Sequence, residues 1–174
     1  MYNRRSRDHL NALTSSADMT DERIELPRSP RPGSTWEVTV DELSSDGRGV
    51  AYFPAYVGPQ REEKDFRFVV RKAVPGDRIE VLVERRRGNR IEGRVNELLE
   101  TSPMRIEPRC RHFGRREVSG KGCGGCTMQS LSYRHQLAAK EKTVKKLVQS
   151  AGLDPGRVHP VQGQDEPWYY RNNM

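Results

Sequence analysis

The sequence predicts a mainly β protein with one long helix. We expect a small closed barrel of five short strands, of the OB type, followed by a cysteine loop and an amphipathic helix. Stretches that alternate apolar and polar residues, or run extended, recur five times between residues 35 and 95. Three cysteines follow within a short stretch, and a helical period begins directly after them.

The first 34 residues have no sustained hydrophobic period and end in a cluster of proline, arginine and serine. The whole chain is 33% hydrophobic, whereas globular proteins average roughly 45–50%. Part of the chain therefore lacks a packed core of its own. We expect residues 1–34 to be a disordered tail, in which Met19 is an alternative start.

The barrel is expected over residues 35–100. Trp36, Val38 and Val40 alternate with polar residues, as in a half-buried strand. Turn residues then separate four further extended runs, at residues 50–53, 66–70, 78–84 and 91–95. Five antiparallel strands, with a polar loop at 54–64, are enough for a small barrel, and such barrels bind single-stranded nucleic acid through one face and its loops.

Basic side chains are expected to contact RNA. Residues 104–149 contain 11 Lys and Arg against 3 Asp and Glu, and this local charge of +8 favours a polyanionic partner, although a solvated basic face is the alternative. Four further arginines gather at a predicted hairpin tip. Aromatic residues of the barrel either stack on bases or fill the core: Tyr52, Phe53, Phe66 and Phe68. The predicted RNA contacts are Arg85, Arg86, Arg87, Arg90, Arg111, Lys142 and Lys145.

The three cysteines are candidate metal ligands. Cys123 and Cys126 enclose two glycines, and such a turn brings two thiolates to the same side of a tight loop. With Cys110 upstream, we expect Cys110, Cys123 and Cys126 to ligate a metal or an iron–sulfur cluster. Zinc in a Cys3His site with His112 is an alternative. Thioredoxin-like chemistry is a weaker one, because no apolar strand precedes this CxxC.

A helix is expected after the cysteines. Its N-cap is Ser130 or Ser132, and Gly152 ends it. One stripe is apolar, and the opposite face is basic. The stripe consists of Tyr133, Leu137, Val144, Leu147, Val148 and Ala151. The chain then ends in an extended aromatic segment around Trp168, which needs a partner to bury it, so we expect a piece of a longer protein.

Taken in order, these motifs resemble the TRAM-domain RNA 5-methyluridine methyltransferases, which methylate uracil in ribosomal or transfer RNA. The matching residues are 102–110, 123–129, 131–140 and 168–172. The resemblance implies a TRAM barrel over 35–100 and, over 101–174, an iron–sulfur loop and helix module that begins the methyltransferase region. It also implies a [4Fe-4S] cluster on the three cysteines. The family's fourth cysteine is absent here, and residues 115–122 look like an insertion.

The resemblance places the S-adenosylmethionine site, the nucleophilic cysteine and the proton-abstracting acid in a domain beyond this chain. We therefore expect no catalytic residue here, and S-adenosylmethionine only through that missing domain. The predicted function is to bind ribosomal or transfer RNA and position it for methylation. The alternatives are a stand-alone TRAM-domain RNA-binding protein with a zinc or iron–sulfur site and an iron–sulfur redox sensor. Because the sequence has no membrane-spanning run or signal peptide, we expect a cytoplasmic protein. We also expect a monomer.

Overall fold

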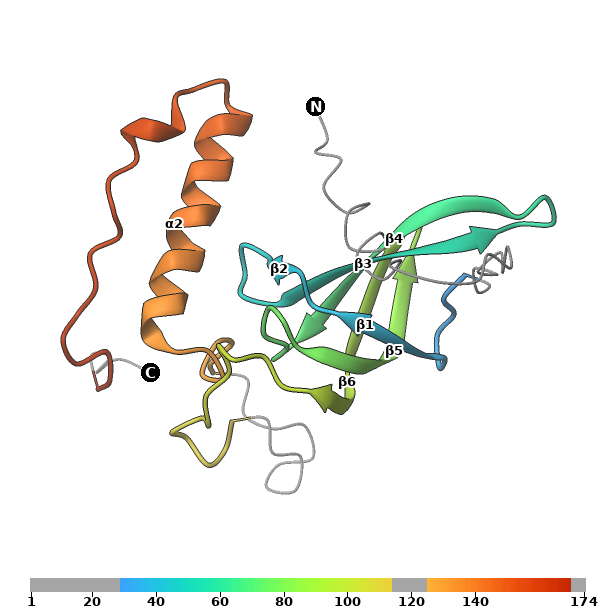
Figure 1. Ribbon diagram of the computed structural model, residues 1–174, viewed down its shortest axis with the longest axis horizontal. Helices are drawn as coiled ribbons and strands as arrows, with labels where there is room; N and C mark the ends of the chain where they lie inside the picture. The colour runs from blue at the N-terminus through green and yellow to red at the C-terminus, as the bar shows by residue number, and fades with distance from the viewer. Residues whose placement is uncertain (1–28, 114–124, 170–174) are drawn as a thin grey trace, which may run out of the picture.

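The computed structural model describes residues 29–113 and 125–169. In these ranges one sheet of six strands precedes a long α-helix and a short 3-10 helix (Figure 1). No helix in this part of the chain is long and apolar enough to cross a bilayer. The expected mainly β fold with one long helix is confirmed. The elements are β1 (Thr35–Thr39), β2 (Glu42–Leu43), β3 (Gly49–Val57), β4 (Glu62–Arg71), β5 (Arg78–Arg87), β6 (Arg90–Glu100), α2 (Tyr133–Ser150) and η3 (Pro155–Arg157).

The strands are ordered β1-β5-β6-β4-β3-β2 across the sheet. Neighbouring strands are antiparallel except β4 and β6, which run parallel with Phe68 opposite Ile91. The expectation of five antiparallel strands is therefore wrong in both count and direction. The hydrogen-bonded order ends at β1 and β2, so this pairing does not confirm the expected closure of the barrel.

The first expected strand is split because the chain changes partners between Val40 and Asp41. The Val40 amide donates to the carbonyl of Asp77, ahead of β5, at 2.9 Å. The Asp41 amide donates to the carbonyl of Val50 in β3 at 2.8 Å. One stretch of chain, residues 35–43, therefore forms both edges of the sheet.

The predicted polar loop at 54–64 is mostly strand. β3 and β4 pair as far as Val57 and Glu62, and only residues 58–61 form the turn. Gly58 has a φ of +72°, in the left-handed region that glycine tolerates best. Backbone hydrogen bonds extend this ladder although residues 62–65 of β4 are all exposed. The hairpin projects away from the rest of the sheet (Figure 1).

The core lies on the inner face of the sheet. Phe66 and Phe68 are almost completely buried, so they fill the core and do not present their rings for base stacking. Trp36 of β1 lies edge-on to Phe53 of β3, with ring centroids 5.4 Å apart, although these strands are not neighbours in the sheet order. This contact shows that the sheet curls. The buried cluster also includes Val38, Val70, Ile79, Val81, Val83 and Ile91.

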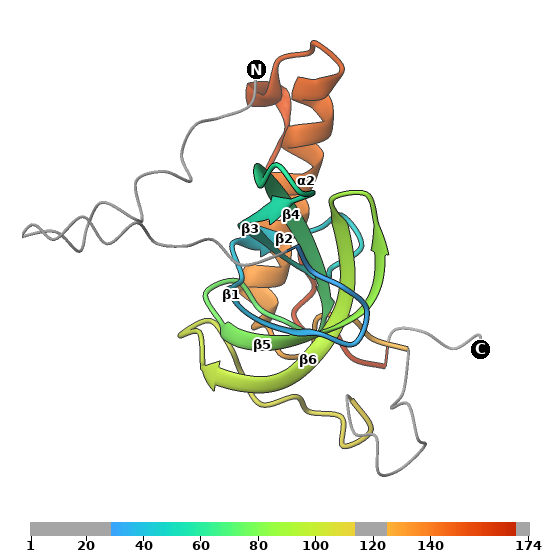
Figure 2. The same cartoon turned by 90° about the vertical axis from the view of Figure 1, so that its right-hand side faces the viewer.

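Strands β5 and β6 curve most strongly (Figure 2). Their pairing contains three register irregularities, and bulges of this kind bend a strand and increase its twist. Gly93 of β6 lies tightly against the backbone of β5. A Cβ added there would lie 2.7 Å from the carbonyl oxygen of Leu82, so only glycine fits without displacing β5.

Residues 29–34 are held against the sheet. The amide of Ser29 donates to the Tyr56 carbonyl, and the Gly33 amide donates to the Val83 carbonyl. Pro30 is fully buried. These residues therefore belong with the sheet and not with the predicted tail of residues 1–34. The rest of that prediction, residues 1–28, lies outside the described residues.

Helix α2 begins after Ser132, one of the two predicted N-caps, and Gly152 follows its C-cap with a φ of +75°. The segment after η3 runs back beside the helix (Figure 1). In this segment the Gln164 amide donates to the Tyr133 hydroxyl at 3.0 Å. None of the helix residues is buried, and Val144 and Leu147 of the apolar stripe remain exposed.

Candidate nucleic-acid interface

Three of the predicted arginines lie around the turn between β5 and β6. Arg85 and Arg87 are exposed near the end of β5, and Arg90 begins β6 with its guanidinium 3.2 Å from Glu92. The strands pair up to Arg87 and Arg90, so the turn is only two residues long. We call Arg85, Arg87 and Arg90 the arginine turn. It presents positive charge at a tight turn of two residues.

Arg86 has a different role. Its Nε donates to the Gly88 carbonyl at 2.9 Å, and its Nη1 donates to the Ser29 hydroxyl and the Pro30 carbonyl at 2.9 and 3.0 Å. The guanidinium carbon also lies 4.9 Å from the centre of the Phe66 ring. Arg86, predicted as an RNA contact, thus fastens residues 29 and 30 to the sheet. Alternation gives no sign of this, because the contact joins residues far apart in the chain.

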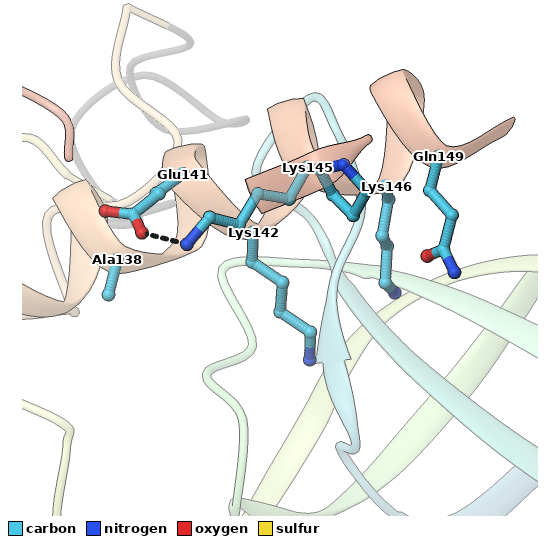
Figure 3. A pocket seen from close by; sticks show the side chains of 7 residues that line it. Ala138, Glu141, Lys142, Lys145, Lys146 and Gln149 are labelled. Carbon is cyan, nitrogen blue, oxygen red and sulfur yellow. Dashed lines mark hydrogen bonds and ion pairs between the residues drawn. The ribbon is translucent and has the colours of Figure 1, made fainter. Parts of the chain in front are cut away.

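Three of the lysines of α2 line an open groove of about 420 Å³ (Figure 3). Lys142 and Lys145 were predicted RNA contacts; Lys146 and Gln149 join them from the same side of the helix. Lys145 Nζ lies 2.6 Å from Glu141, one helical turn away. We call Lys142, Lys145, Lys146 and Gln149 the lysine groove. Lys146 was detectable from sequence, since it follows Lys142 by one helical turn.

A single carboxylate of the sheet contacts this groove. Glu42 of β2 lies 2.5 Å from Lys146 Nζ and 3.6 Å from Lys142 Nζ. Partial burial alone would raise the pKa of Glu42, but the ammonium groups of Lys146 and Lys142 outweigh it and lower the pKa. Glu42 therefore stays ionised at neutral pH and partly neutralises the groove. Sequence reasoning missed it, because the ion pair spans more than a hundred residues.

The arginine turn and the lysine groove occupy separate parts of the sheet. The turn is bonded to the middle of β4, where the Arg67 amide donates to the Asn89 carbonyl at 2.8 Å. The groove meets β2, which pairs with β3 and not with β4. The two basic groups therefore contact different strands, with β3 between those strands. A polyanion that touches both must run across the sheet.

The cysteine loop is tied to the chain that follows it. Gln129, three residues after Cys126, accepts a hydrogen bond from the Cys110 amide at 3.1 Å. Cys110 is half-buried and Cys126 is exposed, and neither forms a disulfide. Cys123 lies outside the described residues. In ranges 29–113 and 125–169, no group of three or more His, Cys, Asp or Glu side chains is placed to hold a metal ion.

The donors present are chemically suited to the expected metals. Thiolates bind both zinc and iron–sulfur clusters, and Cys110 and Cys126 belong to segments that Gln129 joins. His112, the alternative zinc ligand, accepts a hydrogen bond from Arg111 Nε at 3.3 Å. Arg111, a predicted RNA contact, is exposed beside it in the same loop. Two thiols and one imidazole of the expected ligand sets therefore lie within the described residues.

The family model for the TRAM domain matches residues 31–95. An uncharacterized RNA methyltransferase of Halalkalibacterium halodurans is 35% identical over 137 residues, which are 78% of this chain and 26% of that protein. The 23S rRNA (uracil(1939)-C(5))-methyltransferase RlmD of Nitrosococcus oceani is 33% identical over 145 residues, which are 83% of this chain and 29% of that protein. The chain thus spans little more than a quarter of the length of these relatives.

These matches confirm the resemblance drawn from the sequence motifs. The matched domain contains β1 to β5 and most of β6, together with the arginine turn. The longer alignments also extend beyond the matched domain. The chain carries a TRAM domain at residues 31–95 and is similar over most of its length to part of several RNA methyltransferases, among them one named RlmD.

Proposed function

We propose that this chain is the RNA-binding portion of an S-adenosylmethionine-dependent RNA (uracil-C5) methyltransferase, and that it positions the RNA for methylation elsewhere in the protein. The observation that carries the proposal is the TRAM domain at residues 31–95 within a longer match to a 23S rRNA uracil methyltransferase. The charge of +8 in residues 104–149 also supports the proposal, because it attracts a polyanion such as RNA. The name of that relative favours ribosomal RNA over transfer RNA.

We further propose that the sheet is an OB-like barrel. Residues 35–43 supply both of its edges, and the contact of Trp36 with Phe53 lies between strands that do not neighbour each other. OB barrels bind oligonucleotides through loops that include the connection between their last two strands. In this chain that connection is the arginine turn. Arg85 and Arg87 would contact phosphates there, and the lysine groove would hold the backbone at a second point.

The cysteines complete the proposal. Cys110, Cys123 and Cys126 would hold a [4Fe-4S] cluster, or zinc together with His112. Either group would stiffen the loop between β6 and α2, because thiolates from both sides of residues 114–124 would share one centre. The side chain of Gln129 already holds the backbone of Cys110, because it accepts a hydrogen bond from the Cys110 amide.

Fluorescence anisotropy tests RNA binding. The probe is a labelled 23S ribosomal RNA fragment around uridine 1939, titrated with the protein at about 50 and 200 mM salt. We expect saturable binding that weakens steeply with salt, and a smaller salt slope by about 1 for each of Arg85→Ala and Arg87→Ala. Arg157→Ala, an exposed charge on η3, is the control and should leave the slope unchanged. Absence of saturable binding at low salt would refute the function.

A further inference from the structure

Arg109 holds the end of the described chain against the cysteine loop. Its guanidinium carbon lies 4.8 Å from the centre of the Trp168 ring and 5.3 Å from that of Tyr169. Its Nη2 donates to the Tyr169 hydroxyl at 3.3 Å, and its Nη1 lies 3.5 Å from Glu166. One side chain thus makes four contacts with a segment of the chain some sixty residues away. We call Arg109, Trp168 and Tyr169 the aromatic platform.

Tyr169 combines an exposed ring with a strained backbone. It is 87% exposed, the most exposed of the large hydrophobic residues in the described ranges. Its backbone φ is +59°, a conformation that costs a residue other than glycine about 1 kcal/mol or more. Trp168 beside it is only half-buried. Such outliers cluster where a ligand is held, and the exposed ring and the strained backbone coincide at this residue.

The chemistry of the platform matches one ligand. Proteins that bind single-stranded nucleic acid combine aromatic rings, on which bases stack, with cationic side chains that reach the adjacent phosphates. Arg109 is itself about half exposed, so the guanidinium that orients the Tyr169 ring also faces solvent. Arg111 adds a second exposed cation two residues later. The platform lies apart from the core aromatics Phe66 and Phe68, which are buried.

We propose that the aromatic platform is a binding site for an unpaired RNA base, which stacks on Tyr169 while Arg109 contacts the neighbouring phosphate. The inference rests on the proposed RNA-binding function and adds that the RNA is single-stranded at this point. Because Cys110 directly follows Arg109, the unpaired base lies beside the cysteine loop. Duplex RNA keeps its bases inside the helix and offers none to this ring.

The test compares three variants with the parent on three probes, namely oligouridine, an oligomer of abasic sites and a duplex. Tyr169→Ala should weaken binding of a labelled eight-nucleotide oligouridine by about 5- to 150-fold, the range for loss of one stacked base. Tyr169→Gly, which also relieves the positive φ, should behave like Tyr169→Ala. Tyr169→Phe keeps the ring and should bind nearly as the parent does. A duplex of the same length should bind all four proteins equally.

The outcomes separate the two claims. If Tyr169→Ala binds oligouridine as the parent does, or loses as much affinity for an oligomer of abasic sites, the platform does not stack a base and the inference fails while RNA binding stands. If the parent binds neither oligouridine nor the ribosomal fragment at low salt, the proposed function fails and this inference falls with it. An equal loss on duplex RNA would show a general disturbance and would also overturn the inference.

Discussion

The guanidinium of Arg105 makes a two-point ion pair with the fully buried carboxylate of Asp77, with Nε 3.0 Å from Oδ1 and Nη2 2.5 Å from Oδ2. Asp77 also accepts hydrogen bonds from the amides of Val74 and Ser102. Every acceptor direction of this carboxylate is therefore used. The pair joins the turn before β5 to the segment that leads to Cys110.

Removing Arg105 leaves a buried, uncompensated charge. We expect Arg105→Ala to lower the free energy of unfolding by about 3–5 kcal/mol, as for other broken buried pairs. Arg78→Ala is the matched control: Arg78 pairs with Glu37 and Glu100 at the surface, where such pairs contribute less than about 1 kcal/mol. Urea denaturation of both variants measures the difference. Equal losses would contradict the central role given to Asp77.

Under the proposed function, Glu42 would compete with RNA for the lysine groove. Replacing it by glutamine removes a negative charge beside Lys142 and Lys146, so we expect Glu42→Gln to bind the ribosomal fragment about 5-fold more tightly, the equivalent of ~1 kcal/mol of repulsion. Glu37→Gln makes the same charge change on β1, where the partner is Arg78. Anisotropy titrations of both variants decide the matter. A similar gain in both would mean that only net charge counts.

Asp46 gives the fold a defined acid sensitivity. A hydrogen bond from Arg48 is the main cause that lowers the pKa of Asp46 to about 2 from its usual 3.8. Because the folded pKa is the lower one, the carboxylate stabilises the fold above pH ~4, and this contribution is lost as the pH falls towards 2. Asp46 is half exposed, so the contribution is about 1 kcal/mol or less.

Asp46→Asn tests this assignment. The variant should be less stable than the parent at pH 6, and most of this deficit should disappear at pH 2, where about half of the parent carboxyl is protonated. Denaturant titrations at the two pH values give the difference directly. A deficit of the same size at both would show that Asp46 acts through the shape of the turn and not through its charge.

Metal analysis of the purified protein distinguishes the proposed iron–sulfur cluster from the alternative zinc site. Anaerobic purification should yield brown protein containing iron and acid-labile sulfide, and Cys110→Ser or Cys126→Ser should abolish both the colour and the metal. His112→Ala should leave an iron–sulfur cluster intact. Colourless protein with one zinc, lost on His112→Ala, would replace the cluster by the Cys3His site. Protein without metal under these conditions would contradict both assignments.

Local patterns predict the strands better than their pairing. Alternation at Ile79, Val81 and Val83 correctly predicts β5, because these side chains fill one face. The pattern fails at residues 54–64, where Ala55 and Val57 of β3 pack on the core but residues 62–64 of β4 opposite them are exposed and charged. The parallel alignment of β4 and β6 leaves no local trace either, since it depends on how the chain returns after β5.

The sequence likewise predicts only those features of the candidate site that depend on local spacing. Spacing predicts that Lys142 and Lys145 share a helix face, and the structure places both in one groove. Sequence reasoning does not reveal that Arg86 fastens residues 29 and 30, that Glu42 faces the lysines, or that Arg109 meets Trp168. Each of these contacts joins distant parts of the chain, and a charge or ring carries no information about which distant partner it will meet.

The split of the first strand also affects how the domain behaves in a crowded solution. An exposed strand edge is a template on which another chain can add, and this is a common start of aggregation. Here the two edges are a five-residue strand and a two-residue strand, joined end to end by Val40 and Asp41. Glu42 places a charge on the shorter edge. These two terminal strands therefore offer little template for further strands.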